Sequence, residues 1–141
     1  MARILIVGCG CRGRALAAEL QAEGHAVRGT TRRQEALSDI SATGADAVLA
    51  DPERLGTLLP GIEGVSVVCW LVPRGPLGTF LERVVDTPVR GFVYDGSDGA
   101  ALVRSASERW RIPVEIIEED PGDHAAWLAA ATRAAARLLG V

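Results

Sequence analysis

The segment 3–16 constrains the fold most, because it combines a short apolar strand, a glycine-rich turn and the beginning of a helix. Its glycines, Gly8, Gly10 and Gly13, have the G-x-G-x-x-G spacing of a dinucleotide-binding turn. In such a turn the first glycine allows a sharp bend, the second lets the backbone approach a pyrophosphate, and the third allows close helix–strand packing. The free N–H groups at the start of the helix favour an anion. The segment therefore predicts a dinucleotide or related phosphate ligand; the alternative is a glycine turn that serves packing alone.

Apolar runs typical of buried strands alternate with amphipathic, helix-like segments along the whole chain. Asp-Pro pairs, in which Asp caps a helix and Pro occupies its first turn, precede two of these segments, at Asp51 and Asp120. Ser97 or Asp98 can cap the fifth helix. We expect strands at 3–7, 25–30, 46–50, 65–72, 90–94 and 114–117, and helices at 11–23, 33–43, 52–59, 77–85, 99–110 and 121–139.

This alternation predicts an α/β fold with a parallel sheet covered by helices on both faces and joined by right-handed crossovers. The glycine turn favours the doubly wound Rossmann arrangement, with about six strands in the order 3-2-1-4-5-6 and the ligand at the carboxyl ends of strands 1 and 4. A length of 141 residues suits one domain. We expect that this domain occupies residues 1–141 and leaves no room for a separate substrate domain.

Charge and composition argue against several classes of function. A formal net charge of −3 gives no support for nucleic-acid binding, which requires a basic face. All fifteen basic residues are arginines, so any mechanism that needs a lysine is excluded. The chain opens directly in a strand, and its longest apolar run, 65–73, is too short to cross a bilayer. We therefore expect a cytoplasmic protein that binds neither nucleic acid nor membrane.

The three cysteines, Cys9, Cys11 and Cys69, do not form the pattern of a disulfide framework. Cys9 and Cys11 are separated by one residue and have no partner pair elsewhere, so the sequence predicts no metal site. We interpret the two cysteines of the glycine turn as small residues that fill space. The alternative is a reactive thiol, because a helix N-terminus lowers a thiol pKa.

The end of the second strand indicates which dinucleotide would bind. NAD-binding domains place an acidic residue there, about 20 residues after the first glycine, to hold the ribose 2′-hydroxyl. This chain instead has Thr31, Arg32 and Arg33, and arginine pairs bidentately with a phosphate. The sequence thus favours NADP(H) over NAD(H), unless Arg32 and Arg33 only form a solvated start to the next helix. Arg12 can also reach a phosphate, or it is a surface side chain.

The residues above resemble a known family. The run 4–13, followed by Gly24-His25 and 30–32, is similar to the NAD(P)-binding part of the extended and atypical short-chain dehydrogenase/reductases, especially the epimerase-like members. The resemblance covers the first four strands. It implies that Asp51 bonds the adenine amino group in addition to capping a helix, the alternative being a cap alone. It also implies cofactor contacts from the glycine turn and from the segment after strand 4, that is, from Gly8, Cys9, Gly10, Cys11, Arg12, Gly13, Leu71, Val72 and Pro73.

The resemblance does not extend to catalysis. Reductases of that family use a Ser, Tyr and Lys set with Tyr and Lys on the fifth helix, whereas this chain has no lysine and its one tyrosine, Tyr94, lies in the fifth strand. Ser97 lies near the position of the family's serine, although a cap or turn role explains it as well. We therefore assign no catalytic residue.

Three hypotheses follow. The chain is an NADP(H)-binding sensor, regulator or partner subunit, or a small NADPH-dependent oxidoreductase with a non-standard site, or a structural Rossmann domain without a ligand. The alanine-rich last helix, 125–136, could form a dimer contact, but we favour its burial against the chain's own sheet.

Overall fold

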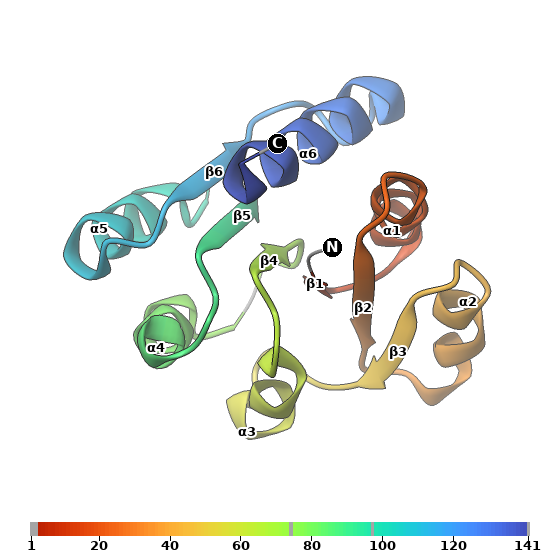
Figure 1. Ribbon diagram of the computed structural model, residues 1–141, viewed down its shortest axis with the longest axis horizontal. Helices are drawn as coiled ribbons and strands as arrows, with labels where there is room; N and C mark the ends of the chain where they lie inside the picture. The colour runs from red at the N-terminus through yellow and green to blue at the C-terminus, as the bar shows by residue number, and fades with distance from the viewer. Residues whose placement is uncertain (1–2, 74, 97, 141) are drawn as a thin grey trace.

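The computed structural model describes residues 3–73, 75–96 and 98–140. They form a six-stranded sheet in the order β3-β2-β1-β4-β5-β6, in which every neighbouring pair is parallel (Figure 1). This confirms the predicted doubly wound α/β fold. The strands are β1 (Arg3–Val7), β2 (Ala26–Thr31), β3 (Asp46–Leu49), β4 (Val67–Trp70), β5 (Gly91–Asp95) and β6 (Val114–Ile117).

Helices connect the strands and cover both faces of the sheet (Figure 1). The α-helices are α1 (Cys11–Ala22), α2 (Leu37–Ser41), α3 (Leu55–Leu58), α4 (Leu77–Arg83), α5 (Ala100–Trp110) and α6 (His124–Leu139). Three 3₁₀ turns extend or precede them: η1 (Gln34–Ala36), η2 (Leu59–Ile62) and η3 (Val84–Asp86).

The alternating side chains of β1 divide the core into two layers. Ile4 and Ile6 pack on the face covered by α1, α2 and α6, whereas Leu5 and Val7 pack on the face covered by α3, α4 and α5. All four side chains are completely buried. Because β1 lies in the middle of the sheet, the glycine turn that follows it is held at the centre of the carboxyl edge.

The predicted helix start at Asp51 is wrong. The Asp51 carboxylate accepts a hydrogen bond from the backbone N–H of Glu53, at 2.9 Å, and α3 begins only at Leu55. This is an Asx turn, a local pattern that competes with a helix cap for the same carboxylate. Thr57 stabilises the turn, because its hydroxyl contacts both the N–H and the carbonyl oxygen of Asp51.

The second Asp-Pro pair fails as a helix start for the same reason. Asp120 accepts from the N–H of Gly122 at 2.8 Å, and the residue that caps α6 is Asp123, which accepts from the N–H of Ala126 at 3.2 Å. At α5 the N-cap is Gly99 rather than Asp98, and no side chain caps it. The alternative cap, Ser97, lies outside the described residues.

Two further elements are shorter than predicted. The second helix, expected over 33–43, is a 3₁₀ turn followed by five α-helical residues. The fourth strand, expected over 65–72, pairs only over Val67–Trp70, although the apolar run extends past both ends of the pairing. An apolar run indicates that its residues are buried. Around this strand, burial continues into the flanking loops, where the hydrogen-bonded pairing with neighbouring strands has ended.

The small residues of α6 pack against the sheet of the same chain, which is the arrangement we favoured over a dimer contact. Ala131 and Ala135 are completely buried, and Ala130 and Ala134 nearly so, in the core layer that α6 shares with α1.

Candidate nucleotide-binding site

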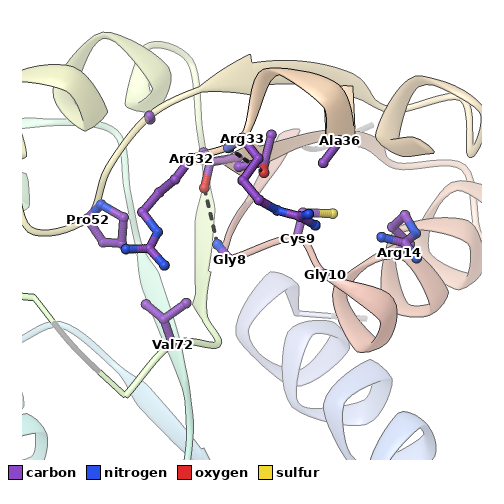
Figure 2. A pocket seen from close by; sticks show the side chains of 12 residues that line it. Gly8, Cys9, Gly10, Arg14, Arg32, Arg33, Ala36, Pro52 and Val72 are labelled. Carbon is purple, nitrogen blue, oxygen red and sulfur yellow. Dashed lines mark hydrogen bonds between the residues drawn. The ribbon is translucent and has the colours of Figure 1, made fainter. Parts of the chain in front are cut away.

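A pocket of about 240 Å³ opens at the carboxyl edge of the sheet, beside the glycine turn (Figure 2). Its walls come from the β1–α1 turn, the end of β2 with η1, and the segments that follow β3 and β4. This is the edge at which ligands bind in open α/β sheets. The lining residues are Gly8, Cys9, Gly10, Arg14, Thr30, Thr31, Arg32, Arg33, Ala36, Ala50, Pro52 and Val72.

The three glycines of the turn have different roles. Gly8 has a φ of +86°, and a Cβ on it would overlap Cγ1 of Val72, so the fold itself requires glycine there. A Cβ on Gly13 would lie 3.1 Å from the carbonyl oxygen of Gly8, which is the tight helix–strand packing expected at the third position. Gly10 differs, since a Cβ there would have no described atom within 4 Å. Its bare backbone faces open space beside the pocket.

The start of α1 carries unsatisfied backbone donors. The N-cap is Gly10, which has no side chain to accept from the first turn. The first N–H groups of an α-helix have no carbonyl partner within the helix and together carry partial positive charge. Arg14 is the first residue of α1 whose N–H reaches back to Gly10, at 2.8 Å. The amides of residues 11–13 are therefore suited to an anion that lies against Gly10.

The end of β2 holds the glycine turn in place. Thr30 is almost completely buried; its hydroxyl oxygen accepts from the N–H of Gly8 at 3.1 Å, and its carbonyl oxygen accepts from the N–H of Cys9 at 2.8 Å (Figure 2). In the next residue, the Thr31 hydroxyl accepts from the N–H of Arg33 at 3.1 Å. These bonds fix the chain direction after β2 and bring two consecutive arginines to the mouth of the pocket.

Three arginines, Arg14, Arg32 and Arg33, line the pocket, and the described lining includes no carboxylate. Arg33 has one acidic partner, Glu35 at 3.7 Å, but both side chains are about 70% exposed, with relative areas of 70% and 72%. An exposed pair of this kind contributes little to stability. The guanidinium of Arg33 is therefore available to an incoming anion, and the pocket has positive charge on more than one wall.

The paired arginines at the end of β2 point in different directions (Figure 2). One guanidinium lies towards Pro52 and Val72, and the other lies towards Cys9. Pro52 and Val72 lie beside the first guanidinium and form an apolar wall that a flat, apolar group can contact. The pocket thus combines an apolar wall with two separated cationic groups.

The structure brings seven of the predicted cofactor-binding residues together in this pocket and leaves six outside its lining. The seven are Gly8, Cys9, Gly10, Thr31, Arg32, Arg33 and Val72; the six are Cys11, Arg12, Gly13, Asp51, Leu71 and Pro73. Sequence reasoning missed Arg14, Thr30, Ala36, Ala50 and Pro52. The signal for Arg14 was present, because it lies one helical turn after Gly10 and hence on the same side of α1.

Arg12 is directed away from the pocket. Its guanidinium forms an ion pair with the Asp95 carboxylate, at 2.5 Å, and lies over the Trp127 ring, 5.0 Å from the centroid. The same carboxylate accepts from the indole N–H of Trp127 at 3.0 Å. Asp95 ends β5 and Trp127 lies in α6, so this cluster joins the first turn of α1 to the other half of the sheet.

Cys9 fills space between the turn and β2, as we interpreted it. A Cβ on Gly29 would lie 2.7 Å from the Cys9 sulfur, so the thiol occupies the room that this glycine leaves. Burial raises the pKa of the Cys9 thiol to about 11, with Arg14 opposing the shift, and burial raises the pKa of Cys69 to about 12. Cys11, in contrast, is exposed.

We predict that a thiol reagent modifies one of the three cysteines, Cys11, in the native protein at pH 8, and modifies all three after unfolding. Because folding raises the pKa of Cys9 and Cys69 above the ordinary value of 9.0, both thiols stay protonated in the folded state when they ionise in the unfolded one. Stability should therefore fall as the pH rises above 9. Mass spectrometry of the labelled protein and urea titrations at pH 8 and 10 check both points. Rapid native labelling of Cys9 would contradict the burial argument.

Tyr94, the one tyrosine, has a structural contact rather than a place in the pocket. Its ring is 3% exposed, and its hydroxyl oxygen accepts from the N–H of Gly99 at 3.1 Å, just before α5. The described residues include no group of His, Cys, Asp and Glu that could hold a metal ion. None of the described helices is long and apolar enough to span a membrane.

No family model and none of the curated proteins matches the chain. Solved structures do match it. Triphenylmethane reductase of Citrobacter sp., complexed with NADP(H), has a TM-score of 0.65 at 18% identity over 83% of this chain and 49% of its own. An NADPH-dependent quinone oxidoreductase of Escherichia coli has 0.67 at 15% identity, over 82% and 46%. A dipicolinate synthase subunit of Bacillus halodurans has 0.66 at 17% identity, over 98% and 45%.

The fold is a Rossmann fold. At these identities the likeness concerns the fold, and the chain spans about half the length of the solved structures it matches.

Proposed function

We propose that the chain binds NADP(H) in the pocket beside the glycine turn, with the adenosine half at the end of β2. One observation carries the proposal: Arg32 and Arg33 stand at the position where NAD-binding domains have a carboxylate, and the described lining of the pocket includes no acidic residue. A carboxylate there would repel a 2′-phosphate, whereas guanidinium groups pair with it through two parallel hydrogen bonds.

The residues present fit the remaining parts of such a ligand. The open backbone face of Gly10 and the N–H groups of residues 11–13 suit a pyrophosphate. Ala50, Pro52 and Val72 offer an apolar surface for the adenine ring. Asp51, between Ala50 and Pro52, uses its carboxylate in the turn with Glu53, so an adenine contact from Asp51 would have to share that carboxylate.

We further propose that the chain is a sensor, regulator or partner subunit rather than a short-chain reductase of the standard type. The chain has no lysine, and the hydroxyl of Tyr94 accepts a backbone hydrogen bond at the start of α5. Both features support a role other than the proton transfer of a Tyr–Lys pair.

A second candidate function is a small NADPH-dependent oxidoreductase with a non-standard site. It is favoured by a cavity of about 590 Å³ at the carboxyl ends of β5 and β6, on the other half of the sheet. Asp95, Ile116 and Pro121 are among its lining residues. In this case the bound cofactor would supply the hydride, and the protein would supply orientation and exclusion of water.

Isothermal titration of the purified chain with NADPH and with NADH tests the first proposal. We expect a dissociation constant in the micromolar range or below for NADPH, and at least tenfold weaker binding of NADH. Equal or tighter binding of NADH would refute the role of the arginines, and no binding of either would refute the proposed function.

NADPH consumption with a panel of carbonyls, flavins and quinones separates the two candidate functions, since turnover of any of these substrates would favour the oxidoreductase.

A further inference from the structure

The described pocket lies mainly on one half of the doubly wound sheet. Its lining comes from the β1–α1 turn and from the chain at the ends of β2 and β3, with Val72 after β4 as the contribution of the other half. No described residue of β5, β6 or the loops after them lines it. In a doubly wound fold the two mononucleotide-binding halves share a dinucleotide between them. The half built by β1, β2 and β3 is the one that carries the paired arginines, and it is the half that suits the adenosine.

The pocket is also small for a dinucleotide. Pockets that bury most of a drug-sized molecule have volumes of roughly 300–1,000 Å³. The volume here is about 240 Å³, below the lower end of that range, and a dinucleotide is larger than most such molecules. The space and the charges suit a phosphorylated adenosine better than they suit the whole ligand.

A cluster of side chains joins the glycine turn to the other half of the sheet. Arg12 leaves the glycine turn and meets Asp95 at the carboxyl end of β5, at 2.5 Å, with Trp127 of α6 bonded to the same carboxylate. Asp95 is only 9% exposed, and Trp127 is completely buried. Asp95 also lines the cavity at the ends of β5 and β6.

The cluster pairs both oxygens of the Asp95 carboxylate. Both carboxylate oxygens of Asp95 are engaged, one by the guanidinium and one by the indole N–H, and the guanidinium also lies over the indole ring. A charged pair with a buried partner is costly to open, since separation leaves the carboxylate without its counter-ion. The connection from the glycine turn to β5 is therefore a stable part of the fold.

From these observations we infer that the site recognises the 2′-phosphoadenosine diphosphate half of its ligand and makes no binding contact with the nicotinamide ring. This inference rests on the proposed NADP(H) function and narrows it. It means that the oxidised and reduced dinucleotides bind alike, and that a nucleotide lacking nicotinamide binds nearly as well. A protein with this property responds to the total amount of the phosphorylated dinucleotide rather than to its redox state.

Isothermal titration with four ligands tests the inference: NADPH, NADP⁺, 2′-phosphoadenosine 5′-diphosphate and nicotinamide mononucleotide. We expect the dissociation constants of the first three to agree within about fivefold, and no measurable binding of the fourth. Binding of 2′-phosphoadenosine 5′-diphosphate more than thirtyfold weaker than that of NADPH, or a tenfold difference between NADPH and NADP⁺, would overturn the inference while leaving the proposed function intact. If none of the ligands binds, the proposed function fails and the inference fails with it.

The variant Asp95→Asn tests the role of the cluster. The amide oxygen can still accept from Trp127, but the charge that holds Arg12 is removed. We expect the dissociation constant of 2′-phosphoadenosine 5′-diphosphate, divided by that of NADPH, to rise at least threefold, because Arg12 is no longer held by Asp95 and NADPH gains contacts that the shorter nucleotide cannot make. An unchanged ratio in a variant with native circular dichroism would show that the ion pair of Arg12 and Asp95 does not restrict the ligand to the adenosine half.

Discussion

Replacement of Gly8 by alanine should lower the free energy of unfolding by about 3 kcal/mol. The left-handed backbone at φ +86° costs an alanine roughly 1–2 kcal/mol. The overlap of its Cβ with Cγ1 of Val72 adds a cost of about 1–3 kcal/mol for overpacking. Urea denaturation followed by tryptophan fluorescence measures the sum. Because Val72 lines the pocket, its displacement should also weaken NADPH binding.

Alanine substitutions at two other glycines separate the backbone cost of Gly8→Ala from the cost of its contact with Val72. Gly24 has a φ of +93° and no described atom within 4 Å of its missing Cβ, so Gly24→Ala carries the backbone cost alone. Gly10→Ala carries neither cost; we expect a loss of less than about 1 kcal/mol in stability, from the poorer N-cap, and at least a tenfold loss of NADPH affinity. If Gly8→Ala costs no more than Gly24→Ala, the contact with Val72 does not constrain the turn.

Substitution of both Arg32 and Arg33 by alanine should weaken NADPH binding by about a hundredfold. A hydrogen bond to a charged group contributes roughly 1.5–3 kcal/mol, and the lower end applies to Arg32 and Arg33 because both side chains are exposed. Two such partners of a 2′-phosphate then account for a loss of about a hundredfold. NADH lacks the phosphate, and its affinity should change by less than about threefold. The test therefore depends on the ratio of the NADH and NADPH dissociation constants. Titration calorimetry of both nucleotides with the wild type and the double variant measures this ratio.

Arg133→Ala is the matched control for the double variant. Arg133 is exposed on α6 and does not line the pocket, yet its loss changes the net charge in the same direction. We expect its nucleotide affinities to equal those of the wild type within experimental error. A double variant that loses NADPH and NADH affinity to the same extent would contradict a 2′-phosphate contact and point to a general electrostatic effect.

The strand order of the sheet could be predicted because it follows from one local sequence feature, the glycine turn after the first strand. The glycine turn after an apolar strand is specific to the doubly wound arrangement, and the bounds of β1 and β6 agree with the expected ones at every residue. Helix starts were harder to predict. Asp51 and Asp120 each turn their carboxylate to the N–H two residues on, and the sequence of an Asx turn does not differ from that of a cap.

In the candidate site, the roles of residues that depend on backbone geometry could be predicted from the sequence. The directions of side chains that have several possible partners could not. Gly8 and Gly13 take the packing roles that their spacing implies. The direction of Arg12, however, depends on Asp95, which lies 83 residues further along the chain. Arg14 was missed although its spacing from Gly10 places it on the side of α1 that borders the pocket.

The close approach of Cys9 and Gly29 has a consequence for how this sequence can diverge. The sulfur of Cys9 occupies the volume that a side chain at position 29 would need, at 2.7 Å from its Cβ. The first variable residue of the glycine turn and the middle of β2 thus share one small volume. In relatives of this chain the two positions should change together, with a larger residue at 29 accompanying glycine at 9. We therefore expect covariation between these two positions.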